Sequence, residues 1–142
     1  MGDVVIALSV LLVAAQVAAP GPAAAKAEAP GAIAARAVEL QKEGKLEAAA
    51  AEYRRFLELA PKSWEARSNL GVVYAQLGRF EEAVQQYREA LAVRPDAVAV
   101  RYNLAVALYK AGRTGEAARE LETVLKEKPD HPAAPLLLAD CR

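Results

Sequence analysis

His131 and Cys141 are the two side chains of this sequence whose chemistry would be easiest to use. An imidazole and a thiol can bind a transition metal, or act as base and nucleophile in a covalent mechanism. They lie ten residues apart on one short segment, and the chain contains no second histidine and no second cysteine. A metal site needs more ligands than this pair provides. We therefore interpret His131 as a solvated turn residue and Cys141 as a half-buried thiol.

Two acidic pairs carry the other groups that could react, Glu81 with Glu82 and Glu120 with Glu122. Paired carboxylates can serve as general acid and general base. These pairs lie opposite the apolar stripe of periodic helical segments, where charge normally faces water. The sequence also lacks the phosphate-binding patterns G-x-G-x-x-G and G-x-x-x-x-G-K followed by Ser or Thr. We therefore predict no enzymatic activity, no metal and no cofactor.

The stretch from Trp64 to Pro95 has the pattern of two helices joined by a tight turn. Apolar and small residues recur three and four positions apart, which is the spacing of one helix face. Glycine takes the left-handed conformation that ends a helix without steric cost, so Gly78 should end the first helix. Pro95 should end the second. The face residues are Leu70, Gly71 and Tyr74 in the first helix and Ala83, Tyr87, Ala90 and Leu91 in the second.

The same unit recurs when the sequence is shifted by 34 residues in either direction. Self-similarity at a fixed period is typical of stacked-repeat architectures. The coincident positions are Gly44, Gly78 and Gly112 at the turn, Ala49, Ala83 and Ala117 at the close helix contact, Tyr53, Tyr87 and Leu121 beyond it, and Pro61, Pro95 and Pro129 at the end.

The period and the spacing L-G-x-x-Y, A-x-x-x-F and P resemble those of the tetratricopeptide repeat. The central copy carries Leu70, Gly71, Tyr74, Ala83 and Pro95, with Tyr87 in place of the phenylalanine. The resemblance implies an all-α fold, an α-solenoid of antiparallel helix pairs in a superhelix. It implies three repeats over about 30–63, 64–97 and 98–131, with a capping helix at 132–142. The tryptophan of the family's first helix is replaced by Ile33, Arg67 and Arg101, and we expect the arginine heads to lie in water.

Local signals place the helices at residues 32–43, 46–59, 63–77, 80–93, 97–111 and 114–127. Ser63, Asp96 and Thr114 have side chains that suit the N-cap position. The segment after His131 continues the repeat register, because Leu138 and Ala139 align with Leu104 and Ala105. Terminal repeats cover the apolar face of their neighbour, so this helix should act as the C-terminal cap.

A second stripe runs along each first helix at i, i+4 and i+7, and Val38, Val72 and Val106 recur in it at the repeat period. In the family that our sequence resembles, this face lines a concave groove that holds a segment of a partner, and a recurrent asparagine there can bond its backbone. The alternative is that the valines simply pack between adjacent first helices. The expected groove residues are Val38, Lys42, Ser68, Asn69, Val72, Gln76, Tyr102, Asn103, Val106, Tyr109 and Lys110.

The groove composition limits the partner that we expect. Some members of the family hold a C-terminal carboxylate with Lys and Arg, and this chain has Ala34, Val38, Ala99 and Asn103 at those places. That clamp is missing. We predict instead an extended or helical peptide segment of another protein, anchored on apolar and tyrosine side chains. Eighteen basic and eighteen acidic residues cancel, so the chain as a whole has no charge that would attract nucleic acid or an anionic membrane.

The first 25 residues do not belong to the repeats. Val4 to Ala19 is an apolar run shorter than the roughly 20 residues that span a bilayer, and Ala23 to Ala25 match the A-x-A rule for signal-peptide cleavage. We expect a signal peptide cleaved after Ala25, a linker at 26–31 and a periplasmic or secreted protein. Asp3, where positive charge is usual, leaves open a short uncleaved membrane anchor, or a buried helix packed on the first repeat.

The alternative function is a self-associating, membrane-anchored structural module of the cell envelope. Leu136 and Leu137 would then remain exposed at the free end of the array and form a weak homo-oligomer contact.

Overall fold

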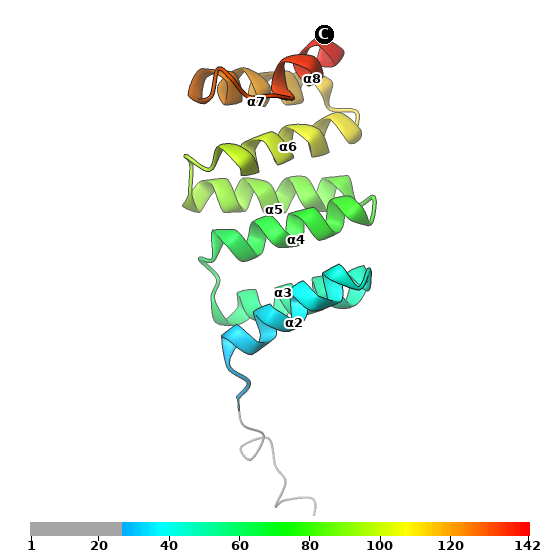
Figure 1. The fold of residues 1–142 in the computed structure, drawn as a ribbon, viewed down its shortest axis with the longest axis vertical. Coiled ribbons are helices and arrows are strands. Elements are labelled where there is room, and N and C mark those ends of the chain that lie inside the picture. The colour runs from blue at the N-terminus through cyan, green and yellow to red at the C-terminus, as the bar shows by residue number, and fades with distance from the viewer. Residues whose placement is uncertain (1–26) are drawn as a thin grey trace, which may run out of the picture.

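The structure is a computed structural model that describes residues 27–142, so the expected leader lies outside the described residues. Seven helices and no strand occur in residues 27–142, as the all-α prediction requires. They stack one on the next along the long axis of the molecule, from α2 at one end to α8 at the other (Figure 1). The helices are α2 (Pro30–Lys42), α3 (Leu46–Leu59), α4 (Trp64–Gln76), α5 (Phe80–Val93), α6 (Val98–Lys110), α7 (Thr114–Glu127) and α8 (Ala134–Cys141).

The helices form consecutive antiparallel pairs, and each pair packs on the next one. α2 packs on α3, α4 on α5 and α6 on α7, while α3 contacts α4, α5 contacts α6 and α7 contacts α8. The extensive contacts therefore join neighbours in the chain, while α4 with α6 and α6 with α8 make smaller contacts across the helix between them, which is the arrangement of a solenoid. The predicted solenoid of helix pairs is confirmed.

Glycine ends the first helix of every repeat. Gly44, Gly78 and Gly112 have φ angles of 76°, 77° and 80°, in the left-handed region that side chains disfavour. The amide after each glycine donates to a carbonyl of the preceding helix, for example from Arg79 to the carbonyl of Tyr74 at 2.8 Å. This hydrogen bond satisfies a carbonyl that the helix end would otherwise leave free.

Most observed helix ends lie within one residue of the predicted ones, but two predicted caps are wrong. α2 begins two residues early, at Pro30, so the linker expected to reach residue 31 ends at Ala29. Ser63 caps α4 by accepting a hydrogen bond from the Ala66 amide at 3.2 Å. Asp96 does not cap α6, because its carboxylate accepts from Arg94 at 2.8 Å. Thr114 is the first residue of α7 rather than its cap.

Small residues let the two helices of a repeat approach closely. Ala49, Ala83 and Ala117 are fully buried between paired helices. In the central repeat the approach is closer still, because a Cβ atom at Gly71 would lie only 2.6 Å from the Tyr87 ring. Gly71 was expected on this helix face, and its lack of a side chain makes room for the Tyr87 ring.

The arginine heads that replace the family's tryptophan do not lie in water, as we had expected. Arg101 donates from Nη1 to Glu120 and from Nη2 to the carbonyl of Pro95, both at 2.9 Å. Arg67 makes the equivalent pair of bonds, to Glu89 and to the carbonyl of Pro61. Each guanidinium therefore ties a first helix to the second helix of its own repeat and to the loop before it.

His131 is also placed differently from the solvated turn residue that we expected. Its Nδ1 accepts hydrogen bonds from the amides of Ala133 and Ala134, at 3.3 and 3.0 Å. The imidazole therefore caps the start of α8, where no other side chain accepts a hydrogen bond from the free amides. α8 covers the end of the third repeat, burying Ala134 and Leu138 with Ala105, Leu121 and Val124. Among residues 27–142, no helix is long and apolar enough to cross a membrane.

Candidate functional site

The predicted groove residues lie on one side of the first helices α2, α4 and α6, and none of them is fully buried. Val38 is 36% exposed, and Val72 and Val106 are half-buried. The three valines therefore retain accessible surface, although neighbouring helices cover part of two of them. Each of the three repeats therefore has accessible side-chain surface at the same position of its first helix.

A hollow of about 420 Å³ opens between α4 and α6. It brings together five predicted residues, while Val38, Lys42, Ser68, Asn69, Tyr102 and Tyr109 lie outside its lining. Residues from α5 form part of its lining as well. The lining residues are Val72, Ala75, Gln76, Phe80, Tyr87, Asn103, Val106, Ala107 and Lys110.

The polar side chains of the hollow come from α4 and α6. Gln76 accepts a hydrogen bond at its Oε1 from Gln41 of α2, at 3.0 Å, which leaves its amide nitrogen as a donor. The Lys110 ammonium lies 5.9 Å from the centre of the Phe80 ring. The hollow therefore combines apolar walls with donors from a glutamine, an asparagine and a lysine, and it has no acidic lining residue.

Four lining residues were not among the predicted groove residues, and the two large ones, Phe80 and Tyr87, come from α5. Tyr87 was read as part of the core, and it is only 2% exposed. Burial raises the pKa of its hydroxyl, so the group stays protonated. One signal in the sequence could have assigned Tyr87 to the site. Gly71 and Ala75 on α4 are both small, so they leave room for the Tyr87 ring to reach the open side of that helix.

The two tyrosines predicted as anchors have different surroundings. Tyr109 is 36% exposed. The ring of Tyr102 lies 4.5 Å from the His131 ring, and Tyr102 packs against the cluster formed by α8. Tyr102 is therefore partly covered by the capping segment, and Tyr109 is the more accessible of the two.

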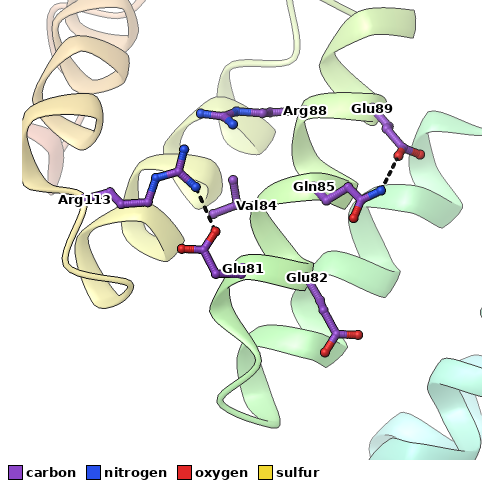
Figure 2. Close-up of a pocket in the computed structure, with 7 residues that line it drawn as sticks. All are labelled: Glu81, Glu82, Val84, Gln85, Arg88, Glu89 and Arg113. Carbon is purple, nitrogen blue, oxygen red and sulfur yellow. Dashed lines mark hydrogen bonds and ion pairs between the residues drawn. The ribbon is translucent and has the colours of Figure 1, made fainter.

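A second hollow, of about 410 Å³, lies on α5 beside the start of α7 (Figure 2). Its charged side chains already pair with charged groups of the same molecule. Arg113 donates to Glu81 at 2.8 Å and Arg88 donates to Glu116 at 2.6 Å. The hydrogen bond from Arg113 is the main cause that lowers the pKa of Glu116 to about 2. A carboxylate with so low a pKa is a poor general acid or base near neutral pH.

The remaining reactive groups do not form a chemical site in residues 27–142. No three His, Cys, Asp or Glu side chains in that range are grouped so that they could hold a metal ion. Burial raises the pKa of the Cys141 thiol, and the Asp140 charge acts in the same direction. A raised pKa reduces the thiolate fraction on which cysteine nucleophiles depend.

Comparison with known families gave matches along most of the chain. A family described as TPR repeat matches residues 39–78 and 73–112, and one described as Tetratricopeptide repeat matches residues 102–142. A search of curated protein sequences gave no match.

Solved structures with the same fold include the second TPR domain of human RPAP3 in complex with the HSP70 peptide SGPTIEEVD. That domain has a TM-score of 0.73 and 24% identity, over 80% of this chain and 98% of the other. The first TPR of Spaghetti (RPAP3), bound to the HSP90 peptide SRMEEVD, has a TM-score of 0.74 and 20% identity, over 79% of this chain and 89% of the other. A Thermobaculum terrenum O-GlcNAc transferase mutant has a TM-score of 0.68 and 28% identity, over 79% of this chain and 22% of the other.

Proposed function

The chain belongs to the tetratricopeptide repeat family, and on that premise we propose that it is an interaction adaptor that holds a peptide segment of another protein. The observation that carries the proposal is the open hollow between α4 and α6, where first-helix residues outside the core, such as Val72 and Val106, line the walls together with residues of α5. Two domains of the same fold are bound to short peptides, which supports this use of the fold.

The groove suits a peptide better than a small substrate. Its apolar walls can receive guest side chains, and its amide side chains can bond a guest backbone. A groove of three repeats buries a modest area, so we propose an affinity in the micromolar range, about −8 kcal/mol. Binding of this kind needs no catalytic group, and the role proposed here is not enzymatic.

Selection of a displayed library of random 12-residue peptides on the full chain tests the proposal. We expect enrichment of a common motif on the unmodified chain and loss of that enrichment on Val106→Lys, which places a charge in the wall of the hollow. Gln85→Lys adds the same charge to the exposed, charged hollow on α5 and serves as the matched control. Equal enrichment on both variants would place binding outside the groove.

A second candidate role is weak self-association through the free end of the array. Leu136 is 73% exposed and Leu137 is half-buried on α8. An exposed apolar end favours contact with another copy of the chain. Light scattering over a range of concentrations tests this role: Leu136→Gln should remove any concentration-dependent dimer, and a concentration-independent monomer would exclude it.

We also propose that the protein is exported and cleaved after Ala25. The apolar run from Val4 to Ala19 and the small residues before Lys26 support this proposal. Such cleavage would leave α2, which begins at Pro30, intact. N-terminal sequencing of protein from the native host tests it, since a mature end at Lys26 supports cleavage and an intact Met1 or Gly2 favours an uncleaved anchor.

A further inference from the structure

Two tyrosines at equivalent positions of successive repeats differ in what their hydroxyls contact. The hydroxyl of Tyr53 donates to Gln41 Oε1 at 3.2 Å. Tyr87, 34 residues later, is equally buried as a residue, at 2% exposure, but its hydroxyl makes no hydrogen bond within residues 27–142 and is not a fully enclosed atom. The Tyr87 hydroxyl therefore faces accessible space, where water or a group of a bound ligand can pair with it.

The difference has a simple cause in the sequence. Position 75, which corresponds to Gln41, is an alanine, so the Gln41 partner of Tyr53 has no counterpart in the central repeat. Ala75 and Tyr87 both line the hollow between α4 and α6. The absence of a glutamine side chain at position 75 therefore leaves space beside Tyr87, whose hydroxyl has no partner of the kind that Gln41 gives to Tyr53.

The residues that line the hollow with Tyr87 include several hydrogen-bond donors, and none of them is acidic. Asn103 and Lys110 line the same hollow from α6, and Gln76 has a free amide nitrogen. Lys42, the equivalent of Lys110 in the first repeat, pairs with Glu39 at 3.0 Å. Lys110 has no acidic partner within residues 27–142, and its ammonium lies beside Phe80. The site thus offers several donors and one uncompensated positive charge.

We propose that this hollow is the specificity pocket of the groove and that it binds the carboxylate side chain of a Glu or Asp within the partner peptide. The proposal rests on the proposed peptide-binding function. A carboxylate is acceptor-only and can receive the Tyr87 hydroxyl, the Asn103 amide and the Lys110 ammonium, while the methylene stem lies on Val72 and Val106. An ammonium would be repelled by Lys110, and a purely apolar side chain would leave the Tyr87 hydroxyl unpaired.

The peptide selection on the full chain tests this proposal when its variants and controls are compared. We expect the unmodified chain to enrich peptides with Glu or Asp at one fixed position of the motif. Tyr87→Phe removes only the hydroxyl, and Lys110→Met removes only the charge. Each should weaken a synthetic copy of the selected peptide about 10-fold, the loss expected for one bond to a charged group. Tyr53→Phe removes the equivalent hydroxyl, which is already paired with Gln41, and should change the affinity less than twofold.

Two changes to the peptide complete the test. Replacement of its acidic residue by Gln or Asn should weaken binding to the unmodified chain about 10-fold, and should have a smaller effect on binding to Tyr87→Phe or Lys110→Met, because each variant already lacks one of the contacts to the carboxylate. Amidation of its C-terminus should leave the affinity unchanged, because the proposed ligand is an internal side chain. Loss of binding on amidation would assign the pocket to a terminal carboxylate and overturn the proposal.

The possible failures are distinguishable. Absence of any enriched motif on the unmodified chain would refute the peptide-binding function and this inference with it. A motif without an acidic position, or an acidic preference that persists in both Tyr87→Phe and Lys110→Met, would leave the function standing and refute the pocket. Circular dichroism of each variant verifies that it is folded, and Lys110 is exposed, so that variant reports on the pocket without touching the core.

Discussion

Replacing Gly71 with alanine should destabilise the central repeat, although alanine is the better helix former. A Cβ atom at this position would lie 2.6 Å from Cε1 of Tyr87 and 2.9 Å from its Cδ1 and Cζ. Carbon atoms in contact normally lie about 3.5–4.0 Å apart, so the ring or the helix must move by about 1 Å. Tyr87 is 2% exposed, so neighbouring residues enclose most of its ring and must move with it.

The size of the effect follows from two opposing contributions. Overpacking a closed core costs about 1–3 kcal/mol. Replacing a glycine inside a helix by alanine gains about 1 kcal/mol. Since this contact is much shorter than an ordinary one, we expect a net loss of about 1–2 kcal/mol. For a domain of this size that loss lowers Tm by about 4–8 °C.

The third repeat supplies the compensating change. Its equivalent pair is Ala105 and Leu121, and both are fully buried. The double variant Gly71→Ala with Tyr87→Leu recreates that pair, so it should be more stable than the sum of the single effects predicts, by about 1 kcal/mol or more. Urea unfolding followed by circular dichroism measures all four members of the cycle.

Gly115→Ala is the matched control for the glycine change. A Cβ atom there has no neighbour within 4 Å, so this variant should be neutral or slightly stabilised. The reasoning is refuted if Gly71→Ala is as stable as Gly115→Ala, or if Tyr87→Leu gives no compensation.

Three further predictions follow from local geometry. Gly78→Ala places a side chain at φ +77°, and it should cost about 1–2 kcal/mol in the same urea assay. The pKa of Glu116 falls from 4.5 to about 2 on folding through its bond with Arg113, so the stabilisation is present above pH 4.5 and is lost as the pH falls toward 2. Glu116→Gln should flatten the stability curve in that window, and an unchanged curve would contradict the pairing. His131→Ala removes the acceptor at the start of α8, and it should cost about 1 kcal/mol and speed hydrogen exchange in α8 but not in α4.

The fold was predictable because every level of the sequence agrees with it. The glycines at the turns, the alanines at the close contacts and the prolines at the ends recur at one period, and all describe the same helix pairs. The failed caps show what a pattern cannot decide. Asp96 suits an N-cap, but Arg94 lies close enough to take its carboxylate, and only coordinates show which bond forms.

The residues that the first helices contribute to the candidate site were predictable from the sequence, but the contribution of Tyr87 from α5 was not. The i, i+4 and i+7 spacing identified Val72 and Val106, because one helix face determines their direction. Tyr87 follows the same periodicity as the core, and its access to the hollow depends on Ala75 on another helix. The contact of Tyr102 with His131 depends on how the capping segment folds back, which periodicity does not describe.

Nuclear magnetic resonance of the full chain, titrated with a peptide from the selection, tests the central claim most directly. The account predicts that the backbone amides of Val72, Asn103, Val106 and Lys110 shift on binding, while those of Glu81 and Arg88 in the charged hollow on α5 do not. Shifts confined to Glu81 and Arg88, with none between α4 and α6, would contradict it.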